Sequence, residues 1–203
     1  MTNYNFQPKG LKSELGWYFR KLPHFEGGEI PQFLTARLFD SLPQKSIEEW
    51  RIKLKKDRSD AAFRKRIEKF LDAGYGECFM SRPEIATVVQ NTLLFYNQVK
   101  YNLISWVVMP NHIHVLLKPY EGVKLSDITQ SIKSYTAHRA NRILNRNGRF
   151  WQAETFDRYI RNRKHFLSVI KYIEDNPVKA KLCENKNDWK FGSAFYRADN
   201  IEY

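Results

Sequence analysis

The stretch Trp106-Val-Val-Met-Pro-Asn-His-Ile-His-Val-Leu-Leu-Lys118 decides the fold. Two apolar runs flank Met109-Pro110-Asn111, a tripeptide typical of turns, so the stretch predicts a strand, a tight turn and a second strand. Side chains two residues apart in a strand share a face. His112 and His114 therefore point the same way, and the residues that point to the opposite layer are Ile113, Val115 and Leu117.

The two histidines are open to two interpretations. Two imidazoles on one face of a strand can chelate a divalent metal ion, but a His-x-His pair is by itself a weak signal. The alternative is a pair of polar residues on the open face of a half-covered sheet. The spacing alone leaves both interpretations standing.

Composition and charge restrict the class of protein. The 203 residues suit one domain, and 42% hydrophobic with 15% aromatic residues is enough for a real core. A formal charge of +12 favours a polyanionic partner, which is nucleic acid or, less readily, an anionic membrane surface. Cys78 and Cys183 form no CxxC pair, so we expect neither a disulfide framework nor a cysteine zinc site. With no apolar run long enough for a membrane helix, we expect a soluble, cytoplasmic protein.

Hydrophobic periodicity predicts further elements on both sides of the hairpin. A first strand covers residues 32–38, and the patterns Ser46-Ile-Glu-Glu49 and Ser81-Arg-Pro-Glu84 are capping boxes that predict helix starts. After the hairpin come a helix capped by Ser126 that ends near residue 147, an aromatic strand over 149–160 and a last helix over 164–176 that stops at Pro177.

This order of elements predicts a split βαβ arrangement of the α+β class, an antiparallel sheet with helices packed on one face. The sheet face that carries the histidines is then left for the last helix or for substrate. We expect a single domain over residues 1–203, with a charged helical insertion at about 46–73 and a C-terminal tail at about 183–203.

The last helix carries two polar residues beside its apolar stripe. Tyr172 and Asn176 are four residues apart, so they lie one above the other on one helix face. Such an edge position suits a reactive side chain, since its stem is packed and its tip is open. The alternatives are that Tyr172 is an amphipathic tyrosine of the core and that Asn176 is the C-terminal cap of the helix before Pro177.

The segment Met109–Leu117 followed by Tyr172-Ile-Glu-Asp-Asn-Pro-Val-Lys-Ala180 resembles the REP-associated tyrosine transposases, members of the His-hydrophobic-His (HUH) superfamily of single-tyrosine transposases and nucleases. The resemblance covers roughly residues 18–195, and further matching stretches are Phe19–His24, Phe39–Pro43, Ser131–Ala137, Phe150–Gln152, Thr155–Arg158 and Trp189. It implies the ferredoxin-like fold of the single-tyrosine transposase domain, in agreement with the order of elements.

The resemblance also implies a chemistry. Tyr172 is the nucleophile, and His112, His114 and Asn176 bind a divalent metal ion, Mg²⁺ or Mn²⁺. The implied substrate is single-stranded or hairpin DNA, such as a repeated extragenic palindrome, which is cleaved through a covalent 5′-phosphotyrosine. A homodimer is expected if two DNA ends are cut together, and a monomer suffices if they are cut in turn.

Basic residues interleaved with aromatic residues provide a surface for single-stranded DNA. The aromatic residues are Phe150, Trp151, Phe156 and Tyr159, although Trp151 and Phe156 also suit a plain core. The cations expected to contact DNA are Arg20, Lys133, Arg139, Arg142, Arg149, Arg158, Arg161 and Arg163.

Two other functions and one other nucleophile stay open. The histidine pair also suits a metal-dependent nucleotide phosphohydrolase without a covalent intermediate, although Leu116 stands where a histidine-triad hydrolase needs a third histidine. A domesticated, non-catalytic DNA-binding protein is the other function. Tyr135 is a rival nucleophile that ranks below Tyr172, because it falls on the apolar stripe of its helix.

Overall fold

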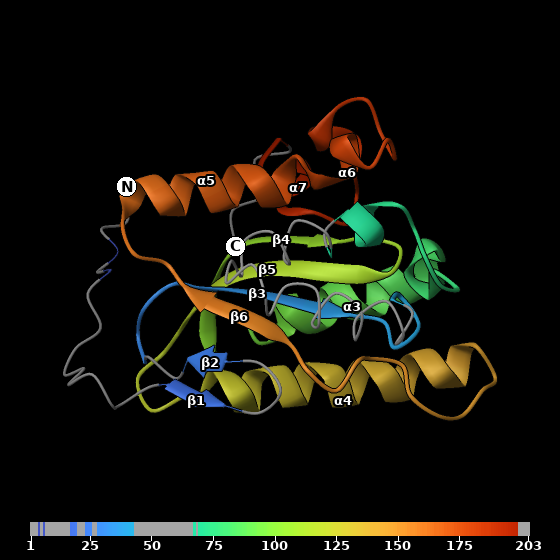
Figure 1. The fold of residues 1–203 in the computed structure, drawn as a ribbon, viewed down its shortest axis with the longest axis horizontal. Helices are drawn as coiled ribbons and strands as arrows, with labels where there is room; N and C mark the ends of the chain where they lie inside the picture. Colours follow the sequence, from blue (N-terminus) through green and yellow to red (C-terminus); the bar gives the residue numbers. More distant parts are fainter. Residues whose placement is uncertain are drawn as a thin grey trace, which may run out of the picture.

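A computed structural model of the chain describes residues 4, 6, 17–19, 23–25, 28–42, 67 and 69–198. Its centre is a four-stranded antiparallel sheet in the order β4–β5–β3–β6 (Figure 1). These strands are β3 (Gln32–Arg37), β4 (Tyr101–Val108), β5 (His112–Pro119) and β6 (Phe156–Tyr159). A separate two-stranded hairpin pairs β1 (Trp17–Phe19) with β2 (Pro23–Phe25).

Helices cover both faces of the sheet (Figure 1). The helices α3 (Pro83–Phe95) and α4 (Leu125–Ile143) lie on one face, and α5 (Arg163–Glu174) lies across the other. The shorter helices are η1 (Phe79–Ser81), α6 (Asn176–Lys179), η2 (Lys186–Asp188) and α7 (Ser193–Ala198). The predicted α+β class is confirmed, and the last long helix takes the histidine face of the sheet.

The central hairpin forms as its alternation predicts. Ile113, Val115 and Leu117 are buried in one core with residues of α3 and α4. Leu116 is buried in a second core with Phe33 of β3 and the apolar stripe of α5. Because side chains alternate between the two faces of β5, this strand contributes residues to both apolar layers. His112 and His114 lie in the layer beneath α5.

Two predicted boundaries are wrong. Of the strand expected over 149–160, only Phe156–Tyr159 belongs to β6, because the pairing is interrupted over residues 152–155 and Trp151 meets Leu38 only through an isolated bridge. The Trp151 side chain is buried, and its Nε1 donates to Thr136 Oγ1 at 2.8 Å. The last helix ends at Glu174, and Asn176 begins the one-turn helix α6 after Asp175. Pro177 lacks an N–H, so one helical hydrogen bond is missing here, although Asp175 stays in a right-handed helical conformation between α5 and α6.

Two predicted helix caps are also wrong. Ser81 lies in the turn of η1, and α3 starts after Arg82 with Pro83 in its first turn and no side-chain cap. The residue before α4 is Lys124, not Ser126, and its side chain makes no cap bond. Asn162 is the side-chain cap of α5, since its Oδ1 accepts from the His165 N–H at 2.9 Å.

The expected insertion at 46–73 lies almost entirely outside the described residues, so its extent stays a prediction. The expected tail contains η2 and α7, which pack against β4. The Val108 N–H donates to the Phe191 carbonyl at 2.8 Å, and Trp189 Nε1 donates to the Val108 carbonyl at 3.0 Å.

Candidate active site

His112 and His114 are buried side by side on β5. Their exposed fractions are 0% and 2%, and their ring centroids are 4.7 Å apart. In the sheet, His114 pairs with Thr35 of β3 and Val107 of β4, so these residues share its face. The histidine pair therefore sits in the middle of the sheet, directly beneath α5.

Asn111 fixes the orientation of the His112 ring. The Asn111 Nδ2 group donates to the carbonyls of Leu71 and Tyr75, at 3.1 and 3.0 Å, so its Oδ1 must face His112. His112 Nδ1 lies 2.7 Å from that oxygen and therefore carries the ring proton. His112 Nε2 is left as a buried lone pair with no hydrogen-bond partner among the described residues. A neutral imidazole with its far nitrogen held by an amide oxygen is the usual form of a metal-binding histidine.

His114 joins the sheet to α5. Its Nδ1 lies 2.8 Å from Thr35 Oγ1, and its Nε2 lies 3.2 Å from the hydroxyl of Tyr172. The rings of His114 and Tyr172 are 5.1 Å apart in an edge-to-face arrangement. Phe33 stacks on His114 on the same side, with centroids 5.5 Å apart. The tyrosine of the last helix thus reaches the histidines of the hairpin.

Burial keeps both imidazoles neutral. It lowers the pKa of His112 to about 3. The pKa of His114 also falls well below its ordinary value, mainly through burial and further through the charges of His112 and Lys179. Both rings can therefore offer a lone pair at neutral pH.

Asn176 is buried one turn beyond Tyr172. It is 1% exposed, and its Oδ1 has no hydrogen-bond partner among the described residues. An unpaired amide oxygen in a buried position is costly unless a further group binds it. The described residues contain no cluster of three or more His, Cys, Asp or Glu side chains that could hold a metal ion. Two imidazoles and an amide oxygen are nevertheless a suitable donor set for Mn²⁺, and acceptable for Mg²⁺.

Tyr135 lies apart from this site. It is on α4, which packs on the opposite face of the sheet, and it is 53% exposed. The expectation that it belongs to the apolar stripe is wrong, because the buried residues of α4 are Leu125, Ile128, Ile132, Thr136 and Ala140.

The predicted DNA-binding cations lie in two groups. Arg139, Arg142 and Arg149 are exposed on α4 and the segment after it. Arg158, Arg161 and Arg163 lie where β6 leads into α5. The strand pairing places Arg158 on the same sheet face as His114, and its guanidinium lies 2.8 Å from His165 Nε2. Arg20 falls outside the described residues.

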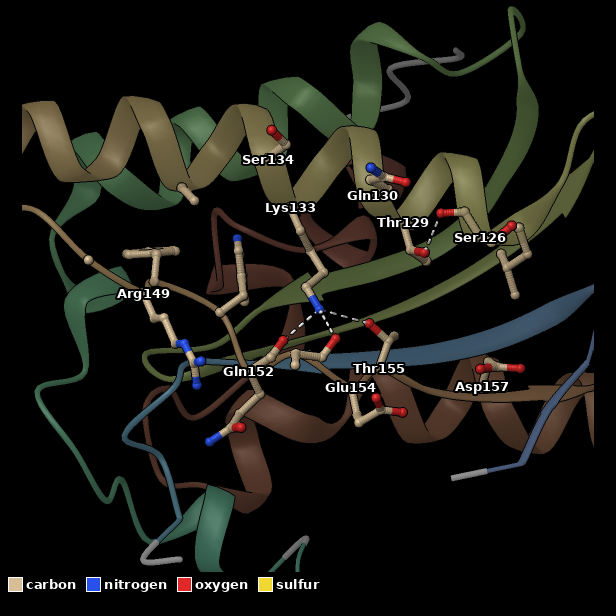
Figure 2. A pocket seen from close by; sticks show the side chains of 16 residues that line it. Ser126, Thr129, Gln130, Lys133, Ser134, Arg149, Gln152, Glu154, Thr155 and Asp157 are labelled. Atoms are coloured by element: carbon tan, nitrogen blue, oxygen red, sulfur yellow. Dashed lines mark hydrogen bonds between the residues drawn. The ribbon is translucent and has the colours of Figure 1, made fainter. Parts of the chain in front are cut away.

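Lys133 points into a pocket of about 630 Å³ between α4 and residues 148–157 (Figure 2). Its Nζ donates to the carbonyls of Gln152 and Ala153, at 2.6 and 2.8 Å, and to Thr155 Oγ1 at 3.4 Å. These bonds tie the segment before β6 to α4. A direct contact of Lys133 with DNA requires these bonds to break, and it stays a prediction.

Two supporting residues of the site were not assigned a role from the sequence. Asn111 orients His112, and Thr35 holds the far nitrogen of His114. The alternation in β3 already placed Thr35 on one face with Phe33 and Arg37, but only the strand pairing shows which histidine it meets. The sequence indicated only that Asn111 belongs to a turn. Its side-chain bonds to Leu71 and Tyr75 depend on tertiary structure and could not be predicted from that local pattern.

Comparisons with known proteins show which proteins this chain is similar to. Residues 80–176 match the family model described as "Transposase IS200 like". The "REP-associated tyrosine transposase" of Escherichia coli (strain K12) is 32% identical over 98 residues, which are 48% of this chain and 56% of the relative. An "Uncharacterized protein" of Haemophilus influenzae is 26% identical over 44% of this chain and 60% of the relative. The chain thus spans a little over half the length of these two relatives.

A solved structure shares the fold. The structure described as "Structure of the REP associates tyrosine transposase bound to a REP hairpin" has a TM-score of 0.58 and 18% identity, and the match covers 91% of this chain and 89% of that one. In the described part of our chain, every helix is too short or too polar to cross a bilayer. Residues 80–176, the part of the chain that matches the IS200-like transposase family model, hold both histidines, Tyr172 and Asn176, and the resemblance of the chain to the REP-associated tyrosine transposases is confirmed.

Proposed function

We propose that the chain is a metal-dependent DNA transposase or nuclease that cleaves single-stranded or hairpin DNA with Tyr172 as the nucleophile. The observation that carries the proposal is the meeting of the Tyr172 hydroxyl with His114 Nε2 at 3.2 Å, beside the unpaired lone pair of His112. Substrates related to repeated extragenic palindromes are proposed from the names of the similar proteins.

Each site residue has a role in this proposal. His112 Nε2, His114 Nε2 and Asn176 Oδ1 would hold the metal ion, and Asn111 and Thr35 orient the two imidazoles. When bound, the ion polarises the scissile phosphate and offsets its developing negative charge. The Tyr172 hydroxyl lies 3.2 Å from His114 Nε2, and a nitrogen cannot hydrogen-bond this hydroxyl and bind an ion together, so the hydroxyl would have to move off the nitrogen when an ion binds.

The covalent step is a transesterification. The Tyr172 oxygen forms a bond to phosphorus, and the bond from phosphorus to the 3′ oxygen of the preceding nucleotide breaks. The phenol proton is lost to water, and the leaving oxygen takes up a proton to become a 3′-hydroxyl. One ester replaces another, so attack by a second 3′-hydroxyl can reverse the step and rejoin strands without ATP.

The DNA is proposed to follow the basic residues at both ends of β6. Arg158 is in β6, Arg161 follows that strand, and Arg163 begins α5, about 13 Å along that helix from Tyr172. Arg139 and Arg142 on α4, and Arg149 in the segment after it, provide further cations. Cations spread over such a surface bind the phosphate backbone without reading sequence, so affinity is expected to fall as salt rises.

The site needs residues from one chain only. His114 and Tyr172 meet within the same molecule, so a monomer can carry out each cleavage. A homodimer that cuts two ends together stays a prediction. The hydrolase and the non-catalytic alternatives have no observation that favours them over the tyrosine nucleophile.

The direct test is trapping of a covalent complex. We expect hairpin-bearing single-stranded DNA and Mn²⁺ to give a protein–DNA adduct that survives a denaturing gel. Tyr172→Phe is expected to abolish the adduct. Tyr135→Phe is the matched control, since this exposed tyrosine lies on the other face of the sheet.

Two results would contradict the proposal. An adduct formed by Tyr172→Phe would show that another residue is the nucleophile. Free DNA ends without any adduct from the wild type would favour a hydrolase in which water attacks the phosphate.

A further inference from the structure

Lys179 continues the line of residues that Tyr172 and Asn176 begin. Asn176 is four residues after Tyr172 and Lys179 is three residues after Asn176, a spacing that keeps all three on one side of the α5–α6 segment. Asp175, between the two helices, keeps a right-handed helical conformation with φ −79° and ψ −6°. The Lys179 N–H donates to the Asp175 carbonyl at 3.0 Å, so the helical path continues through the junction.

The ammonium group of Lys179 lies over the proposed nucleophile. Its Nζ is 5.0 Å from the centroid of the Tyr172 ring, within the range of a cation–π contact. Its charge also acts on the buried His114 below, as the lowered pKa of that ring shows. Lys179 is exposed, and within the described residues no carboxylate forms an ion pair with it. Burial raises the pKa of the Asp72 carboxyl and the Lys179 charge lowers it, so this carboxyl lies within electrostatic reach of the cation. The exposed Lys179 side chain is thus held over the Tyr172 ring, where it can reach a ligand.

We propose that Lys179 is a phosphate-binding residue of the active site, which contacts a non-bridging oxygen of the scissile phosphodiester beside Tyr172. The proposal rests on the function proposed above. The chemistry requires such a group, because negative charge grows on the non-bridging oxygens as the Tyr172 oxygen approaches phosphorus. A lysine supplies a compact positive charge with rotatable donors. It stays protonated throughout, so no bond to Lys179 forms or breaks.

The alternative is that Lys179 is an ordinary solvated lysine with no contact to DNA. A second lysine of the same segment, Lys171, provides the control that distinguishes these two possibilities. Lys171 precedes Tyr172, its side chain is 78% exposed, and its Nζ pairs with Asp175 at 2.9 Å. Lys171→Gln therefore removes the same charge a short distance from the site. Lys179→Gln removes the charge at the site, and Lys179→Arg keeps it.

The first measurement is the single-turnover rate of adduct formation with Mn²⁺ and hairpin DNA. We expect Lys179→Gln to slow the reaction by about 10²-fold, as expected for loss of one transition-state donor. Lys171→Gln should react within about twofold of wild type, and Lys179→Arg should keep most of the rate because it restores the charge. Equal rates for Lys179→Gln and Lys171→Gln would overturn the proposal.

The second measurement needs neither metal nor cleavage. Binding of the same DNA in EDTA is followed from low to high salt. Loss of one phosphate contact lowers the magnitude of the slope of log K against log salt by about 0.7 for a single strand. We expect this change for Lys179→Gln and not for Lys171→Gln. If the wild type forms no adduct, the proposed function fails. The salt dependence of DNA binding still decides whether Lys179 binds phosphate. Equal slopes for the wild type and Lys179→Gln would show that it does not.

A third measurement identifies the phosphate. Once the adduct has located the cleaved bond, a DNA with a neutral methylphosphonate at that position is compared with the natural DNA. The substitution should weaken binding to the wild type and cause little further loss in Lys179→Gln, because the contact is already absent. Independent, additive losses would show that Lys179 does not contact that phosphate.

Discussion

The hydroxyl of Tyr172 lies 3.2 Å from Nε2 of His114, although 58 residues separate them in the chain. A phenol hydrogen-bonded to a nitrogen that a metal ion needs must leave that nitrogen when the ion binds. Tyr172→Phe should therefore not weaken Mn²⁺ binding, measured as the rise of the melting temperature with Mn²⁺ concentration. If the variant lost this rise, the phenol would belong to the metal site itself.

His112→Ala should separate catalysis from DNA binding. The variant loses an imidazole from the proposed metal site, so adduct formation and the stabilisation by Mn²⁺ should both disappear. Salt-sensitive binding of hairpin DNA should persist, because phosphate contacts are spread over many cations. A titration of labelled DNA at several salt concentrations checks this, and a collapse of binding to the level of an unrelated protein would contradict it.

Asn111→Asp should destabilise the fold at the point where it supports His112. The amide Nδ2 donates to the carbonyls of Leu71 and Tyr75, whereas an aspartate oxygen would face them without a proton to share. Leaving buried acceptors unpaired costs about 1–3 kcal/mol of unfolding free energy. Urea denaturation measures the loss. Asn147→Asp, at an exposed position, is the control and should change stability little.

The stability of the metal-free protein should depend on pH through His112. Its pKa is about 3 in the folded protein and near its ordinary value of 6.5 when unfolded, so the unfolded state binds the extra proton between these values. Its contribution is complete above pH 6.5 and is lost as the pH falls toward 3. In His112→Gln, the slope of unfolding free energy against pH should be shallower by about 1.4 kcal/mol per pH unit. Parallel curves for the two proteins would refute this.

Glu174→Gln should weaken the attachment of the C-terminal segment. The Glu174 side chain is 7% exposed and forms ion pairs with Lys186 and Arg197, which are 40% and 44% exposed. We expect a loss of about 1–3 kcal/mol by urea denaturation, since the cations stay partly hydrated and only the carboxylate is buried. Glu84→Gln breaks the exposed pair with Arg82 and should cost less than about 1 kcal/mol. Equal losses for the two variants would show that burial of Glu174 is unimportant.

The sequence predicted what depends on short-range pattern. The alternation in β5 placed His112 and His114 on one face and the apolar residues on the other, because a strand repeats every two residues whatever surrounds it. The helical spacing likewise placed Tyr172 beside the buried stripe of α5. The order of elements left the histidine face of the sheet for the last helix or for substrate, and the family resemblance implied that Tyr172 meets the histidines there.

The rest depends on contacts between distant segments. No local pattern shows that Asn111 binds Leu71 and Tyr75, or that the Trp151 indole donates to Thr136. The hairpin of β1 and β2 was also unexpected, since its short strands show no periodicity. Phe25, the last residue of β2, is anchored by a bond from its N–H to Asp157 Oδ2 at 2.8 Å, a contact between residues 132 positions apart.

The C-terminal segment beside β4 has a consequence for how molecules meet. β4 is an outer strand of the sheet, and such a strand offers unpaired backbone groups to any extended chain. Gly192 forms a bridge to Val107, the Phe191 carbonyl takes the Val108 N–H, and the Arg197 guanidinium reaches the Ile104 carbonyl. These contacts pair backbone groups on the outer edge of β4, so this edge is protected from pairing with the sheet of another molecule and from edge-to-edge aggregation. If two copies associate to cut paired DNA ends, they must meet through some surface other than this one.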